Sequence, residues 1–193
     1  MALALVLIPL SILSQQPREI VRLAMDFNST PANGNPGGLL VSGNKLYFVA
    51  TDGTHGIELW QTDGTNITRL TDLSYGSMNS FIAQPTEFNG ELYFRGSGTT
   101  NGNINLELWK YDGTNALLVA EINPGPGSSN PSGFRVYNGV LYFPASDGST
   151  GTELWAYDGV GASQVADINP GAGSSNPSGL TVYGGLLCFA IPQ

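Results

Sequence analysis

Two loops of this sequence place a pair of carboxylates at a spacing that suits a metal ion. Asp52 and Glu58 flank a glycine-bearing stretch, and Asp147 and Glu153 repeat the arrangement at the same separation. Calcium takes about six to eight oxygen ligands from carboxylates and backbone carbonyls, and such loops can supply several of them. These four residues are therefore a candidate calcium site. The alternative is a turn that the aspartate holds by hydrogen bonds to nearby backbone amides.

Other reactive side chains lack partners in the sequence. His55 and Cys188 are the single histidine and the single cysteine, so no transition-metal set is apparent. Cys188 occupies a position that is tyrosine elsewhere in a repeat, which indicates a core substitution. Ser129 and Ser175 have no base nearby in the sequence. We therefore expect no nucleophilic catalysis from these residues.

An internal repeat organises nearly the whole chain. Three Leu-Tyr-Phe segments and one Leu-Cys-Phe segment end at phenylalanines separated by 46, 49 and 46 residues, namely Phe48, Phe94, Phe143 and Phe189. A Glu-Leu-Trp motif recurs with tryptophans at Trp60, Trp109 and Trp155, and an Asp-Gly pair follows each one, at Asp63, Asp112 and Asp158. Such self-similarity at a fixed period is typical of repeat architectures.

The third repeat unit shows the expected strands most clearly. Asn138-Gly139 predicts a tight hairpin, because both residues of that turn need positive φ. Strands are expected over 134–137, 140–145, 152–157 and 163–167. Each unit is then a four-stranded antiparallel meander of about 46 residues, the size of a propeller blade. The predicted fold class is all-β, a β-propeller that is either partial or four-bladed.

The repeat also divides the chain. Residues 15–193 are expected to form the repeat domain, with units at about 37–72, 83–121, 132–167 and a partial unit at 178–193. Residues 1–14 form an apolar run that resembles a signal peptide but lacks a basic start. The alternative is that N-terminal segments, 2–8 and 19–26, close a four-bladed ring as the missing strands of the last unit. A fragment of a longer chain with further repeats is favoured slightly.

The Glu-Leu-Trp segments resemble the ELWxxDGT repeat family, also called hyalin-like repeats, of bacterial secreted and surface proteins. Residues 58–65 and 107–114 fit the eight-residue signature in full, and residues 153–160 depart at Val160 alone. The resemblance implies export and a propeller-like fold. It implies no assigned chemistry for any residue.

The repeated positions argue for structural roles. The three tryptophans suit packing between units better than sugar stacking, because large aromatic side chains dominate protein cores. Twelve of the 15 acidic residues recur at equivalent positions, whereas an active site needs a unique set. We therefore expect that the chain is not an enzyme. The polar segments between units, 123–133 and 169–179, either link the units or offer several weak binding sites.

Composition narrows the partners and the location. The net charge is −8 and the pI about 4.3, so nucleic acid and anionic membranes are poor partners. The apolar N-terminal run is too short to cross a membrane. Charged residues are 11% of the chain, which together with the family resemblance favours a secreted or cell-surface protein.

Three functions follow as expectations. The leading one is an extracellular or cell-surface binding or adhesion module for a carbohydrate or protein ligand. The second is a structural spacer within a larger surface protein. The third, less favoured, is a propeller-type carbohydrate-active enzyme, which would need a carboxylate pair outside the repeat.

Overall fold

The computed structural model describes residues 33–74, 76–98 and 104–192. The expectations for residues 1–14, 2–8 and 19–26 lie outside these residues. In the described part every regular element is a strand, so the all-β prediction is confirmed. No helix in that part has the length and apolar character needed to cross a bilayer.

The fourteen strands form four antiparallel sheets that follow the chain order. The first sheet contains β1 (Gly37–Ser42), β2 (Lys45–Ala50), β3 (Glu58–Thr62) and β4 (Ile67–Arg69). The second contains β5 (Ala83–Phe88), β6 (Glu91–Gly96), β7 (Glu107–Tyr111) and β8 (Ala116–Ala120). The third contains β9 (Arg135–Tyr137), β10 (Val140–Ser146), β11 (Thr152–Tyr157) and β12 (Ala162–Ala166). The fourth has two strands, β13 (Ser178–Tyr183) and β14 (Leu186–Ala190).

Each sheet is a meander in which neighbours in sequence pair. The phenylalanine of the second strand lies opposite the tryptophan of the third, as in Phe48 with Trp60 and Phe143 with Trp155. The hairpin at Asn138-Gly139 has φ values of 49° and 74°, as its sequence predicts.

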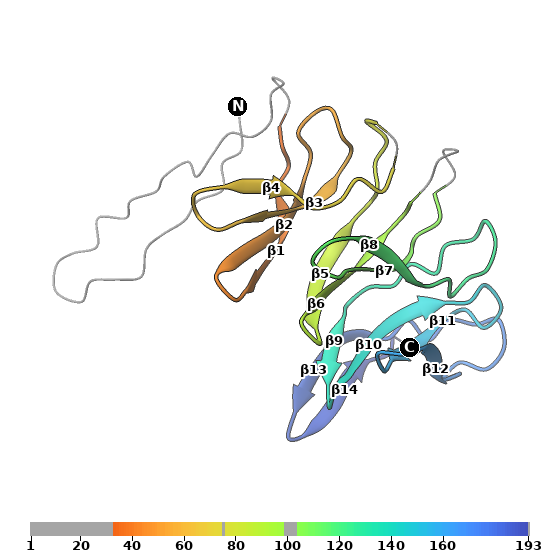
Figure 1. The fold of residues 1–193 in the computed structure, drawn as a ribbon. Coiled ribbons are helices and arrows are strands. Elements are labelled where there is room, and N and C mark those ends of the chain that lie inside the picture. Colours follow the sequence, from red (N-terminus) through yellow and green to blue (C-terminus); the bar gives the residue numbers. More distant parts are fainter. Residues whose placement is uncertain (1–32, 75, 99–103, 193) are drawn as a thin grey trace.

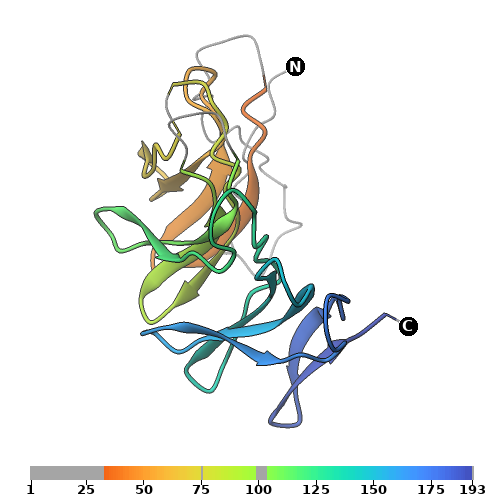
Figure 2. The same ribbon diagram turned by 90° about the vertical axis from the view of Figure 1, so that its right-hand side faces the viewer.

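Hydrophobic clusters lie between consecutive sheets. One contains Leu59 of β3 together with Leu92 and Phe94 of β6, and another contains Tyr93 of β6 together with Phe143 of β10. The second sheet therefore packs against a neighbouring sheet on each of its faces. The sheets succeed one another in chain order from β1–β4 at one end to β13–β14 at the other (Figure 1; Figure 2).

The first strands of the sheets approach one another. Strand β1 contacts β5, and β9 contacts β13. The register shifts by a β-bulge in β1, β5 and β13, in each case two or three residues after the strand begins. Bulges re-aim side chains and are enriched next to functional sites, so these first strands are where a site is best sought.

Candidate functional site

The repeated glutamates are buried at the junctions between sheets. Glu107 Oε1 accepts a hydrogen bond from Ser129 N at 3.0 Å, and Oε2 accepts from Ser129 Oγ at 2.5 Å and Ile122 N at 2.8 Å. Glu153 is held in the same way by Ser175 and Ile168. We call these contacts the Glu–Ser latches.

The first latch, at Glu58, has a threonine hydroxyl in addition to the serine. Glu58 accepts from the hydroxyls of Ser80 and Thr71 and from Leu73 N. Burial raises the pKa of Glu58 against the lowering effect of these hydrogen bonds. Burial likewise raises the pKa of Glu107, which the hydrogen bonds from Ser129 partly offset.

Two of the latch serines, Ser80 and Ser129, join neighbouring sheets. Ser129 Oγ donates to Glu107 of β7, while the Ser129 carbonyl accepts from Ser146 N of β10 at 2.9 Å. Ser80 makes the equivalent pair of contacts with Glu58 and Ser97. No partner for these serines could be recognised in the sequence, because each glutamate lies 22 residues earlier. Their role is structural, since serine and glutamate are both buried.

The aspartates of the candidate calcium loops contact their own loops. Asp147 Oδ1 accepts from Ser149 N and Thr150 N, each at 2.8 Å. Asp52 accepts from the amides of Thr54 and His55 and lies 2.7 Å from His55 Nδ1. Partial burial acts to raise the pKa of Asp52, but these hydrogen bonds hold it well below its usual range.

The four candidate calcium ligands are thus engaged in two separate kinds of contact. Asp52 and Asp147 hold loops, whereas Glu58 and Glu153 belong to latches. Among the described residues, no three His, Cys, Asp or Glu side chains gather where they could hold a metal ion. Calcium binding stays a prediction that these contacts do not favour.

The tryptophans and the Asp-Gly turns have structural surroundings. Trp60 is 7% exposed and its Nε1 donates to the Ala50 carbonyl at 3.0 Å. Trp109 and Trp155 are half-buried and pack against the clusters between sheets. Each turn aspartate accepts two backbone amides through Oδ1, at Asp63, Asp112 and Asp158.

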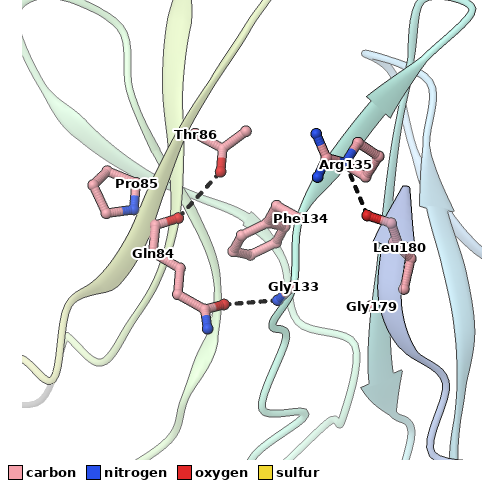
Figure 3. A pocket seen from close by; sticks show the side chains of 8 residues that line it. All are labelled: Gln84, Pro85, Thr86, Gly133, Phe134, Arg135, Gly179 and Leu180. Carbon is pink, nitrogen blue, oxygen red and sulfur yellow. Dashed lines mark hydrogen bonds between the residues drawn. The ribbon is translucent and has the colours of Figure 1, made fainter. Parts of the chain in front are cut away.

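A pocket of about 290 Å³ lies where the first strands of three consecutive sheets meet. Its walls come from β5, from β9 and the residues before it, and from β13 (Figure 3). We call it the first-strand pocket. It is lined by Gln84, Pro85, Thr86, Gly133, Phe134, Arg135, Gly179 and Leu180.

Gln84 departs from the repeat at this pocket. The equivalent positions in the other units are Gly38, Gly133 and Gly179, with φ values of 56°, 55° and 63°. Gln84 adopts the same left-handed conformation at φ 56°, which glycine tolerates and a longer residue adopts with strain. Its Oε1 accepts from Gly133 N at 2.7 Å, across the junction between two sheets. Such strain persists where the surroundings enforce it, and it clusters at functional sites.

Arg135 faces Gln84 across the pocket (Figure 3). Its Nε donates to the Leu180 carbonyl of β13 at 2.9 Å. The equivalent positions in the other units are Leu40, Thr86 and Thr181, so the cation is also a departure from the repeat. Phe134, between the two, packs against Phe143 with ring centroids 5.5 Å apart.

Sequence reasoning missed this pocket because it gave weight to residues that recur. The available signal was a departure from the repeat rather than a recurrence. Aligning the four units shows glutamine at position 84 where the others have glycine, and arginine at position 135 where the others have uncharged residues. Only the fold, however, brings residues 49 positions apart to hydrogen-bond distance.

Comparisons with known proteins give little for this chain. No family model matches it, and no curated protein matches it. Among solved structures it is similar to the acylaminoacyl peptidase of Pyrococcus horikoshii, with a TM-score of 0.48 and 18% identity. The match covers 67% of this chain and 19% of the peptidase chain. A likeness of this degree decides neither the fold nor an activity.

Proposed function

We propose that the chain is part of a β-propeller and acts as a non-catalytic binding module of a secreted or cell-surface protein. Its ligand, a carbohydrate or a protein segment, occupies the first-strand pocket. The observation that carries the proposal is Gln84, which takes a left-handed conformation where the other three units have glycine. A glutamine in that conformation carries backbone strain, and strained positions cluster at functional sites.

The propeller assignment is supported by the packing of the sheets. Consecutive four-stranded meanders bury clusters between their faces, and their first strands approach one another. This is the arrangement expected of blades around a centre. The ELWxxDGT resemblance points in the same direction.

The non-catalytic assignment is supported by how the carboxylates are used. The repeated glutamates are occupied in latches and the turn aspartates cap their own loops. The eight pocket residues include no Asp or Glu, so a carboxylate pair for glycoside hydrolysis is absent from this lining.

Further repeats of a longer chain are proposed as partners of the outer sheets. Leu39 of β1 is 60% exposed and Tyr183 of β13 is 80% exposed. The equivalent residues of the second sheet, Pro85 and Phe88, are buried against its neighbours, so another unit would cover Leu39 and Tyr183.

The test is a binding screen with purified chain. Soluble glycans and polysaccharides are titrated by calorimetry against the wild type and Phe134→Ala, with the exposed Val160→Ala as control. We expect at least one glycan to bind, and to bind at least about tenfold more weakly to Phe134→Ala. A wild type that binds none, or a Phe134→Ala variant that binds as well as the control, supports the spacer function instead.

A further inference from the structure

The first-strand pocket offers a single cation whose hydrogen-bonding capacity is partly unused. Arg135 Nε is fixed by the Leu180 carbonyl, which orients the planar guanidinium. Within the described residues its two Nη amino groups have no hydrogen-bond partner, and the residue is exposed. A guanidinium presents paired N–H groups whose spacing matches the two oxygens of a carboxylate.

Charge favours a monoanion over a dianion. Arg135 is the one charged residue among the eight that line the pocket. The chain as a whole carries −8, so each negative charge on a ligand meets a repulsive field. One carboxylate is balanced by one arginine, whereas a phosphate dianion would leave a charge uncompensated.

The rest of the lining suits a sugar ring. Phe134 is half-buried and held by its contact with Phe143, and it lies between Gln84 and Arg135 (Figure 3). An aromatic face of this kind packs against the C–H groups of a sugar. Gln84 Oε1 is occupied by Gly133 N, which leaves the amide NH₂ as a donor for hydroxyl oxygens. The Thr86 hydroxyl, 3.3 Å from the Gln84 carbonyl, adds a polar group on the same strand.

We propose that the first-strand pocket binds one uronic acid unit of an acidic glycan. Its carboxylate pairs with the Arg135 guanidinium, its ring packs on Phe134 and its hydroxyls contact Gln84 and Thr86. The pocket volume of about 290 Å³ is at the small end for ligand pockets, which fits a single sugar unit. This inference rests on the proposed binding function and names the ligand class.

The test compares three ligands by calorimetry on the full chain. They are a galacturonic acid trimer, a neutral galactose trimer and a short peptide with a free C-terminal carboxylate. We expect the acidic trimer to bind about tenfold to a hundredfold more tightly than the neutral one, as a charge-assisted pair provides. The peptide is expected to bind more weakly than the acidic trimer, because it lacks a sugar ring.

Two variants at position 135 test the residue. Arg135→Gln is expected to reduce affinity for the acidic trimer to the level of the neutral one. Arg135→Lys keeps the charge but not the paired N–H groups of the guanidinium, and we expect an intermediate loss of affinity for the acidic trimer. Lys45→Gln removes an equal charge from β2, where Lys45 contacts Gln61, and is expected to leave binding unchanged. Thermal unfolding of each variant shows whether loss of the Leu180 contact disturbs the fold. If Arg135→Gln lowers the melting temperature, the affinity of Arg135→Lys is used to test the role of the guanidinium.

The outcomes separate this inference from the function beneath it. Equal binding of acidic and neutral trimers, unaffected at position 135 but weakened by Phe134→Ala, overturns the carboxylate assignment and leaves the binding function standing. A peptide that binds as tightly as the acidic trimer overturns the sugar assignment. Wild-type chain that binds none of the three overturns the uronic acid proposal, and failure of the wider glycan screen as well overturns the binding function.

Discussion

The Glu–Ser latches and the first-strand pocket both lie at junctions between sheets, but they use the repeat in opposite ways. At the latches, Glu107 and Glu153 have the same partners at the same chain separation. At the pocket, Gln84 and Arg135 replace the residues of the other units. The contrast shows that the recurring polar residues stabilise the repeated sheets. Residues that depart from the repeat indicate where a ligand would bind.

Removing a latch should have the largest effect on stability. Glu107→Ala leaves the backbone amides of Ile122 and Ser129 without their acceptor in a buried place, and the Ser129 hydroxyl keeps only its longer contact with the Leu106 carbonyl, at 3.2 Å. We expect a loss of about 3 kcal/mol in the free energy of unfolding, measured in urea. Glu87→Ala removes an exposed carboxylate from β5 and should change stability by less than about 0.5 kcal/mol. Equal losses in both variants would contradict a special role for the latch.

A glycine pair tests how closely the segments between sheets must pack. A Cβ on Gly151 would lie 2.4 Å from the Gly173 carbonyl oxygen, and its φ is +75°. A Cβ on Gly171, at φ +91°, would meet no atom within 4 Å. Gly171→Ala should therefore cost about 1 kcal/mol of backbone strain, and Gly151→Ala about 2 to 3 kcal/mol. Similar melting temperatures for the two variants would show that the close approach is unimportant.

The pocket should respond to mutation in binding rather than in stability. Gln84→Gly relieves the left-handed strain, about 1 kcal/mol, but loses the hydrogen bond from Gly133 N, which is worth a similar amount. We expect urea unfolding to shift by less than about 1 kcal/mol while glycan affinity falls several-fold. A variant that unfolds at much lower urea concentration would show that Gln84 stabilises the fold instead.

Acid should act on the turn residue Asp63 and on the buried Glu107 with opposite signs. Hydrogen bonds from the backbone and side chain of Asn66, and from Thr65 N, hold the pKa of Asp63 at about 2. A lowered folded pKa contributes stability above the unfolded value, near 4, and that stability is lost as pH falls toward 2. The raised pKa of Glu107 does the reverse, since its contribution is present at low pH and is lost as pH rises through the folded pKa.

The measurement for this last comparison is urea unfolding at pH 7 and pH 2.5. Asp63→Asn keeps an oxygen that can accept the two turn amides but does not titrate. We therefore expect its stability to fall less between the two pH values than that of the wild type. Identical pH dependence would mean that Asp63 does not contribute to acid unfolding.

Most strands and turns could be predicted from the sequence because the residues that determine them are close together in the chain. Asn138-Gly139 predicts its hairpin through the backbone angles that the turn requires, and the strands expected on either side of it match β9 and β10 to within one residue. The repeat then carries this assignment to the other units. Strand β12 lies one residue earlier than expected, which is within the ordinary uncertainty of strand ends.

The candidate site was less predictable because its contacts are long-range. The pairing of Ser129 with Glu107 crosses a segment rich in glycine and proline whose path the sequence does not specify. The loop spacing of Asp52 and Glu58 predicted a shared calcium site, but Glu58 begins β3 and its carboxylate accepts hydrogen bonds from Thr71 and Ser80. Gln84 and Gly133 meet only because the sheet of β5 and the sheet that β9 begins are adjacent, with Gly133 just before β9.

The bridging serines Ser80 and Ser129 couple the unfolding of the sheets that they join. Ser129 is hydrogen-bonded to Glu107 of one sheet and to the backbone of Ser146 in the next. Unfolding of either sheet therefore breaks a hydrogen bond of the segment that also stabilises the other sheet. Unfolding should then spread from sheet to sheet through nearest-neighbour coupling, as in a one-dimensional chain of interacting units. Damage at one junction would be felt most strongly by the two sheets that share it, and progressively less by those farther along.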